Sequence, residues 1–524
     1  MSERGNKYEN NINPIIKADY PDPDVIRVGD VYYMISTTMH FMPGGVILRS
    51  YDLAHWEIAS YLFDTLDDTP QERLERDFCN YAGGMWAGSL RYCDGVFYAS
   101  FVSHFTKTTY LFTSKDINGP WKKGTIEGYY HDLSLLFDDD GRKYLVYGNR
   151  EIRLVELNDD LSAPKENGIN QVIVTDNTDA GLGYEGSHFY HINGKYYLFL
   201  IHWPKAAPGR RTEACFMSDS VTGPYTGGDV FNDDRGYFNM GVAQGGIVDT
   251  PTGHWYSIMF QDSGAVGRMP VLVPITFGND GFPIFGTDGC VPKTVNILTS
   301  RPYYRYEPLY TSDDFVPEEE NSRKLKIQWQ WNHACNNDFW ELLPEGGLSV
   351  KTGKISANLT QAQNCLTQRM MFPKCEAEVT IDASDLKDGD VAGLCALIGS
   401  YAFLGITKET GAYYLIKVVH EPINNYQVGI GGGDFLPGTV VEKIRLKDSV
   451  ITFCLKANFA GMIDKVDFFY LKDERFVKVG EPHKLEFRLD HFTGARFGLF
   501  VYSTKMSKGR AVFRNFVYRY ESED

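Results

Sequence analysis

Three carboxylic acids occupy corresponding places ahead of glycine-containing turns in the first 300 residues. Asp132 and Glu185 each lie nine residues before a turn glycine, and Asp22 lies seven residues before another. Carboxylates brought together without basic neighbours raise one another's pKa, because each disfavours the charge on the others. One acid can then stay protonated at neutral pH while another acts as a base, the division of roles that hydrolysis of a glycosidic bond requires.

The local sequence around these acids favours a functional role over a turn cap or a solvated position. Asp22 stands between Pro21 and Pro23, which stiffen the backbone on both sides of it. Glu185 is followed by Gly186, which permits close approach of the backbone beside the acid. We therefore expect the three acids to share one site.

A repeated turn predicts the elements that position the acids. Five times, a turn that contains glycine is followed by an aromatic-rich strand, at residues 28–33, 93–98, 140–144, 193–197 and 252–256. Asp-Gly and Asn-Gly pairs in these turns supply the positive φ angles of a tight hairpin. A second, serine-containing marker that ends in Trp or Tyr recurs at 50–56, 114–121 and 218–225. Two markers in constant order indicate a five-bladed β-propeller of four-stranded blades rather than an irregular sandwich.

Trp86 and Gln244 occupy the two remaining positions, each nine residues before a turn glycine. The innermost strands of a propeller line its axis, so corresponding positions in successive blades converge on one funnel. The repeat therefore predicts a ring of three acids, an amide and an aromatic platform, although a Trp on an inner strand can equally belong to the core.

The periodicity stops after Phe285, and a second domain is expected. Residues 301–321 hold an aromatic stretch and then the acidic run Glu318–Glu320, which we interpret as a linker. Beyond it, segments such as 412–419, 451–457, 484–489 and 511–520 alternate as half-buried strands do. We predict an all-β chain with a five-bladed β-propeller at 1–310 and a β-sandwich at 322–524.

Composition limits the function classes. The chain has 524 residues, 14% aromatic residues and a formal charge of −16, which argues against nucleic acid and anionic membranes as partners and suits a neutral substrate. Nine cysteines without paired spacing indicate free thiols in a reducing compartment. Residues 1–13 contain no apolar run typical of a signal sequence, so we expect a cytoplasmic protein.

These motifs together resemble glycoside hydrolase family 43. The resemblance runs in order through the predicted propeller and rests on the segments Asn13–Pro14, Tyr20–Pro23, Gly84–Ala87, His131–Ser134, Tyr184–His188, Gly267–Arg268 and Asp280–Pro283. The C-terminal region is similar, with weaker motifs, to the β-sandwich of many β-xylosidases and α-L-arabinofuranosidases of that family.

The resemblance implies an inverting mechanism. Asp22 would be the general base that activates water, Glu185 the general acid, and Asp132 the residue that raises the pKa of Glu185 and orients it. Inversion needs room for a water molecule, so we expect a base–acid carboxyl separation of roughly 6.5–9.5 Å.

The remaining expected site residues are secondary to the acids. Arg268 would complement the carboxylates and bind sugar hydroxyls, and His40 and Phe41 could form the pocket wall. Gln244 stands where many family members carry a His associated with a hydrated metal, and an amide is a poor transition-metal ligand. We expect no required cofactor, with a largely water-bound calcium ion in the central channel as the alternative.

The expected function is exo-acting release of pentoses, α-L-arabinofuranosyl or β-D-xylosyl, from the non-reducing ends of xylan- or arabinoxylan-derived oligosaccharides. An endo-arabinanase and a non-catalytic carbohydrate-binding propeller are the alternatives, with a retaining fructan hydrolase as a weaker one. The oligomeric state stays open, a homo-oligomer included. The resemblance also suggests that the loop at residues 491–493 reaches from the sandwich to the pocket mouth.

Overall fold

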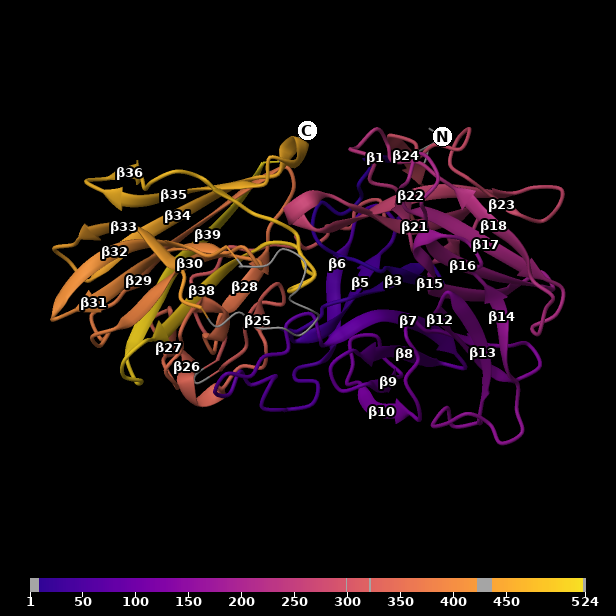
Figure 1. Ribbon diagram of the computed structural model, residues 1–524, viewed down its shortest axis with the longest axis horizontal. Coiled ribbons are helices and arrows are strands. Elements are labelled where there is room, and N and C mark those ends of the chain that lie inside the picture. Colours follow the sequence, from indigo (N-terminus) through magenta and orange to yellow (C-terminus); the bar gives the residue numbers. More distant parts are fainter. Residues whose placement is uncertain (1–8, 298, 320–321, 422–435, 522–524) are drawn as a thin grey trace, which may run out of the picture.

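The computed structural model describes residues 9–297, 299–319, 322–421 and 436–521, and it confirms the predicted all-β fold. Two lobes lie side by side, the propeller in indigo to magenta and the sandwich in orange to yellow (Figure 1). Residues 1–8 of the N-terminal segment and Glu320 of the expected linker lie outside the described residues. In the described ranges, the only helical elements are the 3₁₀ turns at Gly264–Val266, Asn337–Phe339, Leu359–Gln361 and Ala460–Met462, and no helix could cross a membrane.

Five antiparallel sheets form the predicted propeller blades. Blades I to III comprise β2 (Asp24–Val28), β3 (Val31–Ser36), β5 (Gly44–Ser50) and β6 (Glu57–Phe63); β7 (Met85–Cys93), β8 (Val96–Ser103), β9 (Thr108–Ser114) and β10 (Lys122–Ile126); and β11 (Ser134–Phe137), β12 (Lys143–Asn149), β13 (Glu151–Leu157) and β14 (Asn170–Thr175). Blades IV and V comprise β15 (Ala180–Ile192), β16 (Lys195–Pro204), β17 (Thr212–Ser218) and β18 (Thr226–Phe231); and β19 (Val242–Ala243), β20 (Ile247–Asp249), β21 (Trp255–Asp262), β22 (Arg268–Phe277) and β23 (Pro283–Phe285).

Each predicted glycine turn joins the innermost strand of a blade to the next strand. The five turn glycines have φ angles of 66° to 83°, in the left-handed region where glycine carries no Cβ penalty. Apolar clusters fill the interfaces between successive blades, and the cluster between blades V and I continues into the core of the sandwich. The aromatic-rich strands are therefore buried on both faces.

The N-terminal segment closes the ring. Strand β1 (Glu9–Ile12) pairs with β24 (Thr294–Ile297) outside the blades. The side chain of Asn13 donates to the carbonyl of Leu272 at 2.8 Å and accepts from the Leu272 N–H at 2.9 Å, so it acts as one more strand residue beside β22. These bonds fix the chain that leads to Asp22.

The C-terminal domain is a sandwich of two sheets. One has the order β33 (Thr439–Arg445), β32 (Ala412–Val419), β31 (Ala402–Glu409), β30 (Asp390–Leu397), β38 (Arg496–Ser503), β28 (Leu366–Arg369), β25 (Gln330–Asn332) and β4 (Phe41–Met42). The other has the order β26 (Trp340–Leu342), β27 (Leu348–Lys351), β39 (Arg510–Glu521), β29 (Lys374–Asp382), β34 (Val450–Asn458), β35 (Lys465–Lys472) and β36 (Arg475–Lys478), with β37 (His483–Lys484) beside β35. Strand β4 comes from blade I, so one sheet spans both domains.

One predicted strand is wrong. Residues 484–489 alternate in polarity, yet only Lys484 belongs to a strand, in β37. Leu485 enters the core through its side chain, and the residues after it turn away toward the propeller. The alternation reflects one buried anchor and not a ladder of hydrogen bonds.

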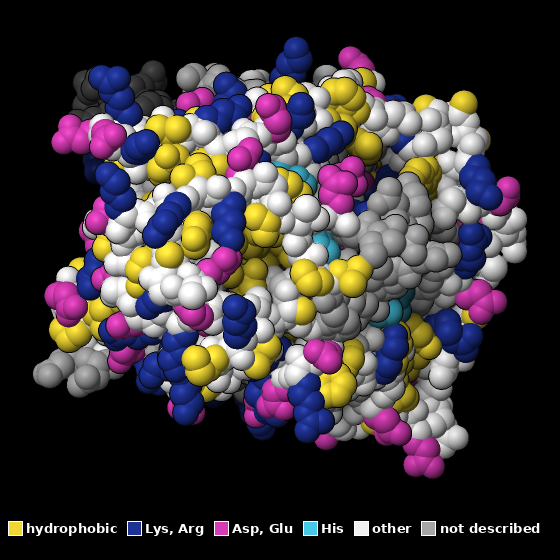
Figure 2. Space-filling model, turned by 60° about the vertical axis from the view of Figure 1, so that its left-hand side comes forward, with side chains coloured by type: hydrophobic (Ala, Val, Ile, Leu, Met, Phe, Trp, Pro, Cys, Tyr) yellow, Lys and Arg dark blue, Asp and Glu magenta, His cyan; other side chains and the backbone are white. Residues whose placement is uncertain are grey.

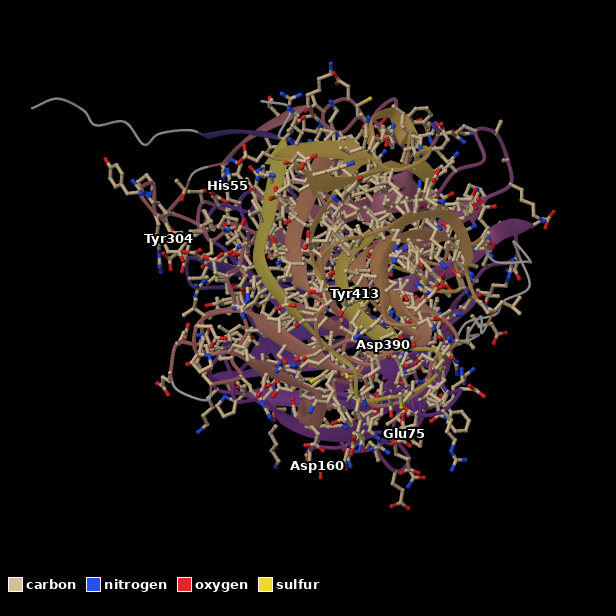
Figure 3. All side chains as sticks on the ribbon, turned by 90° about the vertical axis from the view of Figure 1, so that its left-hand side faces the viewer. His55, Glu75, Asp160, Tyr304, Asp390 and Tyr413 are labelled. Atoms are coloured by element: carbon tan, nitrogen blue, oxygen red, sulfur yellow. The ribbon has the colours of Figure 1, made fainter. Side chains whose placement is uncertain are left out.

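The surface of the sandwich side carries mixed charges. Lysine, arginine and acidic side chains alternate over the described part of this face (Figure 2). Seen from this side, Asp390 of β30 and Tyr413 of β32 lie near the middle of the view, and His55 and Tyr304 lie toward its edge (Figure 3).

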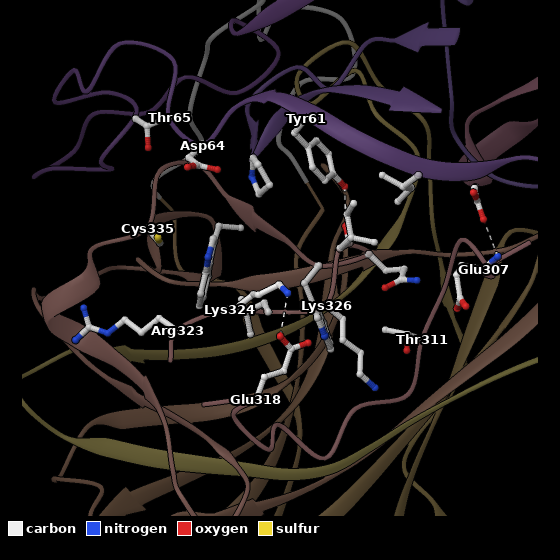
Figure 4. Close-up of a pocket in the computed structure, with 18 of the residues that line it drawn as sticks. Tyr61, Asp64, Thr65, Glu307, Thr311, Glu318, Arg323, Lys324, Lys326 and Cys335 are labelled. Atoms are coloured by element: carbon white, nitrogen blue, oxygen red, sulfur yellow. Dashed lines mark hydrogen bonds and ion pairs between the residues drawn. The ribbon is translucent and has the colours of Figure 1, made fainter. Parts of the chain in front are cut away.

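A cavity of about 1080 Å³ separates blade I from the linker and the sandwich (Figure 4). Tyr61 lines it from blade I, Tyr304 from the linker region and Trp340 from the sandwich. None of the three acids is among the described residues that line it, so this cavity is distinct from the acid site.

Candidate active site

Corresponding backbone positions present the site residues. Asp22, Asp132 and Gln244 have φ angles of 52°, 50° and 58°, and each lies just ahead of an innermost strand. Positive φ is uncommon for residues other than glycine. Glu185 lies within β15 and is followed by Gly186, whose φ is 67°. The blade repeat is thus visible in the local conformation of the residues that it brings to the axis.

Asp22 is a buried carboxylate with both oxygens engaged. The hydroxyl of Thr37 donates to its Oδ2 at 2.7 Å, and Nη1 of Arg268 donates to its Oδ1 at 3.0 Å. Arg268 is itself 4% exposed. Hydrogen bonds from two different side chains thus hold the Asp22 carboxylate in place.

Asp132 and Glu185 form a separate acidic pair with His131. One ligand atom from each of the three lies within 4.8 Å of the others. Nε2 of His131 lies 3.3 Å from Oε2 of Glu185 and 3.6 Å from Oδ2 of Asp132, and the Asn149 amide donates to Glu185. Oδ1 of Asp132 is buried without a hydrogen-bond partner in the structure.

Burial and nearby charges shift the pKa values of Asp132 and His131 in this cluster. Burial raises the pKa of Asp132 to about 7; the charge of His131 opposes this shift, and the charges of Glu185 and Asp22 add to it. Burial lowers the pKa of His131, but the two acids outweigh that effect and raise it to about 9.

Two aromatic rings flank the acids. Trp86 stacks on His104 at 4.5 Å, lies 5.7 Å from the His131 ring and anchors its indole N–H on the Ala82 carbonyl. Phe492, from the sandwich, lies 5.5 Å from Trp86, and the guanidinium of Arg268 sits over its ring at 4.5 Å. The expected approach of the 491–493 loop is therefore observed.

The structure corrects the pocket wall expected from residues 37–43. His40 and Phe41 are 0% and 1% exposed, so neither can touch a substrate. His40 packs between Tyr81 and His333, at 4.7 and 4.9 Å. Phe41 belongs to the sheet shared by the two domains, which is why both residues are covered.

Gln244 supports the acid strand. Its side chain lies against Gly186, where an added Cβ would come within 2.7 Å of it, and its backbone N–H donates to buried Glu213 at 2.7 Å. Gln244 is 7% exposed, and these contacts are with Gly186 and Glu213 of the protein itself.

Several site residues were not found from the sequence. His131 directly precedes Asp132, so the motif contained that signal. Asn149 ends β12 and Arg211 lies in the connection between β16 and β17, and no motif of the sequence links either residue to the acids. Arg211 forms an ion pair with Asp262. Burial and the charge of Arg268 lower the pKa of Arg211 to about 10, while Glu185 and Asp22 oppose the shift, which places its guanidinium near the acids.

Among the residues that the structure describes, two groups have the donor types that bind metals: His131 with Asp132 and Glu185, and Asp138 with Asp139 and His191. The first is the acid site itself. On the axis, Asp24 already accepts from Arg91 at 2.6 Å and contacts His188 at 2.9 Å. A cation beside Asp24 would meet the positive charge of Arg91.

Comparison with known proteins agrees with this site. A profile of glycosyl hydrolases family 43 matches residues 12–283, and a β-xylosidase C-terminal concanavalin A-like domain matches residues 313–519. A β-xylosidase of Formosa agariphila is 28% identical over 97% of this chain and 90% of the relative. A non-reducing-end α-L-arabinofuranosidase of Bacteroides ovatus is 26% identical over 86% of each protein.

A solved structure of a bifunctional GH43-CE protein of Bacteroides eggerthii aligns with a TM-score of 0.88 and 38% identity over 99% of this chain. This chain spans 64% of the length of that protein. A propeller with an axial acid site and an appended sandwich defines a glycosidase. The chain belongs to glycoside hydrolase family 43.

The raised pKa of Asp132 predicts a gain in stability for Asp132→Asn. Ionising Asp132 costs more in the folded than in the unfolded state, so wild-type stability falls as pH rises from about 4 to about 7. Asparagine cannot ionise, and the variant should unfold a few degrees higher than wild type at pH 8, with little difference at pH 4. Thermal unfolding at both pH values measures this.

Asp22→Asn is the matched control. That carboxylate is paired with Arg268, so its replacement should lower the unfolding temperature at pH 8. A lower unfolding temperature for Asp132→Asn than for wild type at pH 8 would show that ionised Asp132 does not destabilise the folded protein.

Proposed function

We propose that the protein removes single pentoses, β-D-xylosyl or α-L-arabinofuranosyl, from the non-reducing ends of xylan- or arabinoxylan-derived oligosaccharides, with inversion. One observation carries this proposal: the Asp22 carboxylate is paired with Arg268, whereas Asp132 and Glu185 gather around His131, where the pKa of Asp132 is raised to about 7. Base and acid are thereby already distinguished in the free enzyme.

Each acid then has one step. A carboxylate oxygen of Asp22 takes a proton from water as the water oxygen attacks the anomeric carbon. The bond from that carbon to the glycosidic oxygen breaks, and Glu185 gives its proton to the departing oxygen. Asp132 and His131 keep a proton available to Glu185, and Asn149 holds the Glu185 carboxyl in place.

The pocket supports exo action. Phe492 of the sandwich and Trp86 of blade II stand 5.5 Å apart over the site, and Phe492 covers Arg268. An endo-arabinanase needs a groove open at both ends, and the sandwich loop obstructs one side. The relatives' names include both xylosidase and arabinofuranosidase, which supports testing both sugars.

Asp22→Ala and Glu185→Ala should separate the base from the acid. We expect Asp22→Ala to lower kcat by about 10³-fold or more on every substrate, because no other group activates water. Glu185→Ala should lose as much on xylobiose but far less on 2,4-dinitrophenyl xyloside, whose leaving group needs no proton. Steady-state kinetics on both substrates measures the difference.

Asp138→Asn provides the control, since Asp138 is a buried acid that accepts from Tyr196 away from the pocket. It should keep near-normal rates. Equal losses on both substrates for Glu185→Ala would remove Glu185 from the role of acid.

A panel of aryl pentosides tests the substrate class and the stereochemistry together. Hydrolysis of p-nitrophenyl β-D-xyloside or α-L-arabinofuranoside should release, in the first seconds, the sugar of opposite anomeric configuration, as seen by NMR. Retention would contradict the inverting assignment, and cleavage of debranched arabinan without aryl pentosides would favour the endo-arabinanase. Binding of xylo-oligosaccharides without turnover would favour a non-catalytic propeller.

We also propose that turnover requires no metal, since the acids and His131 supply the proton transfers. Treatment with EDTA followed by desalting should leave kcat within about twofold of its starting value, a change too small to reflect loss of a catalytic group. A larger loss that added calcium restores would show instead that an ion in the central channel supports the site.

A further inference from the structure

Asp19 bonds to both domains at the edge of the pocket. It lies three residues before Asp22 and is 5% exposed. Its Oδ1 accepts from the backbone N–H of Arg268, in the propeller, at 2.8 Å. Its Oδ2 accepts from the backbone N–H of Gly494, in the sandwich, at 2.8 Å. One carboxylate therefore joins the two chain segments that carry Arg268 and Phe492.

The contact is tight on both sides. Gly267 has a φ of 103°, and an added Cβ there would collide with the Asp19 carboxyl. A Cβ on Gly494 would lie 2.7 Å from the Asp19 Cβ. The Ala495 N–H donates to the Ala265 carbonyl at 2.8 Å, which extends the contact by one more bond. Backbone meets backbone here, with no room for a side chain between the segments.

Two buried arginines of the sandwich lie near Asp19 and supply positive charge opposite its carboxylate. Arg369 and Arg496 are 4% and 2% exposed, and both donate to Oε1 of Gln330, at 2.9 and 3.0 Å. Nε of Arg369 donates to the Asp19 carbonyl at 2.8 Å. Burial and the nearby Arg369 lower the pKa of Arg496, and the charge of Asp19 opposes that shift. A neutral side chain at position 19 would leave two buried guanidinium groups without this counter-charge.

Both segments lead directly into the pocket. Arg268 binds Asp22, and Phe492 covers the guanidinium of Arg268 while its carbonyl accepts from Nη2 at 3.4 Å. A shift of either segment would move Arg268 relative to Asp22. We propose that Asp19 is a positioning residue that couples the sandwich loop to the catalytic base. This inference rests on the proposed function, in which Asp22 is that base.

Asp19→Asn is the test, because it keeps the shape of the side chain and removes the charge and one of the two acceptors. Its amide NH₂ would face a backbone N–H. We expect kcat/KM for an aryl pentoside to fall by about 10- to 100-fold well below the unfolding temperature, since small misplacements at a catalytic site cost that much. KM and the inhibition constant of the free pentose should both rise.

Asp313→Asn is the matched control. Asp313 is 7% exposed and also accepts two hydrogen bonds, from the Phe315 N–H and the Trp329 indole N–H, both at 2.9 Å, away from the pocket. It should lower the unfolding temperature and leave kcat/KM within about twofold. Equal kinetic losses in the two variants would reduce Asp19 to a purely structural role and overturn the proposal.

A double-mutant cycle with Phe492→Ala gives a second readout. If Asp19 acts through the Phe492 loop, Asp19→Asn should cost much less in the Phe492→Ala background, whereas independent effects would multiply and contradict the coupling.

Hydrogen exchange separates this proposal from the proposed function. Asp19→Asn should speed exchange at residues 264–268 and 490–496, and Asp313→Asn should not. This holds whether or not the protein cleaves pentosides. An inactive wild type with these exchange changes would sink only the proposed function; an active wild type with unchanged exchange in Asp19→Asn would sink only the coupling.

Discussion

The buried ion pair between Asp24 and Arg91 on the propeller axis is the interaction on which the acid site depends. Nη1 of Arg91 donates to Asp24 at 2.6 Å, Nη2 donates to the hydroxyl of Ser134 at 2.7 Å, and Nδ1 of His188 lies 2.9 Å from the other Asp24 oxygen. Burial would raise the pKa of Asp24, but Arg91 and His188 hold it below its ordinary value. Together with Ser134 and His188, the pair connects the innermost strands of four blades. Removal of either Asp24 or Arg91 would leave an uncompensated charge inside the protein.

Residues of this axial network follow the three acids closely in the sequence. Asp24 follows Asp22 by two residues, Ser134 follows Asp132 by two, and His188 follows Glu185 by three. Because each network residue lies two or three positions after an acid, the bonds of the network also fix where the backbone carries that acid. Asp132 is destabilised by the negative charges of Glu185 and Asp22, whereas Asp24 is stabilised by Arg91 and His188. The attraction within the axial network therefore offsets part of the free-energy cost of bringing the acids together.

The sequence allowed the propeller and the acids to be predicted because both follow from local patterns. The turn glycines appear at every blade, and counting back from them reached Asp22, Asp132 and Glu185. Residues whose position depends on distant contacts were missed or misassigned. His40 looked like part of a pocket, but a strand some 290 residues later covers it. Arg211 lies in the connection between β16 and β17 and approaches the acids from there, which no local motif reports.

The sheet that runs through both domains also constrains how the protein is made. Strand β4, in the connection between β3 and β5 of blade I, can join its sheet only after Trp331 and Asn332 have left the ribosome and paired with it. The apolar cluster that begins between blades V and I is completed later still, because it also contains residues of β38 and β39. A nascent chain with all five blades synthesised thus exposes an unpaired strand, β4, and apolar surface, the features that invite aggregation. Phe492, which lies beside Trp86 over the acid site, likewise reaches its place only after most of the sandwich has been synthesised.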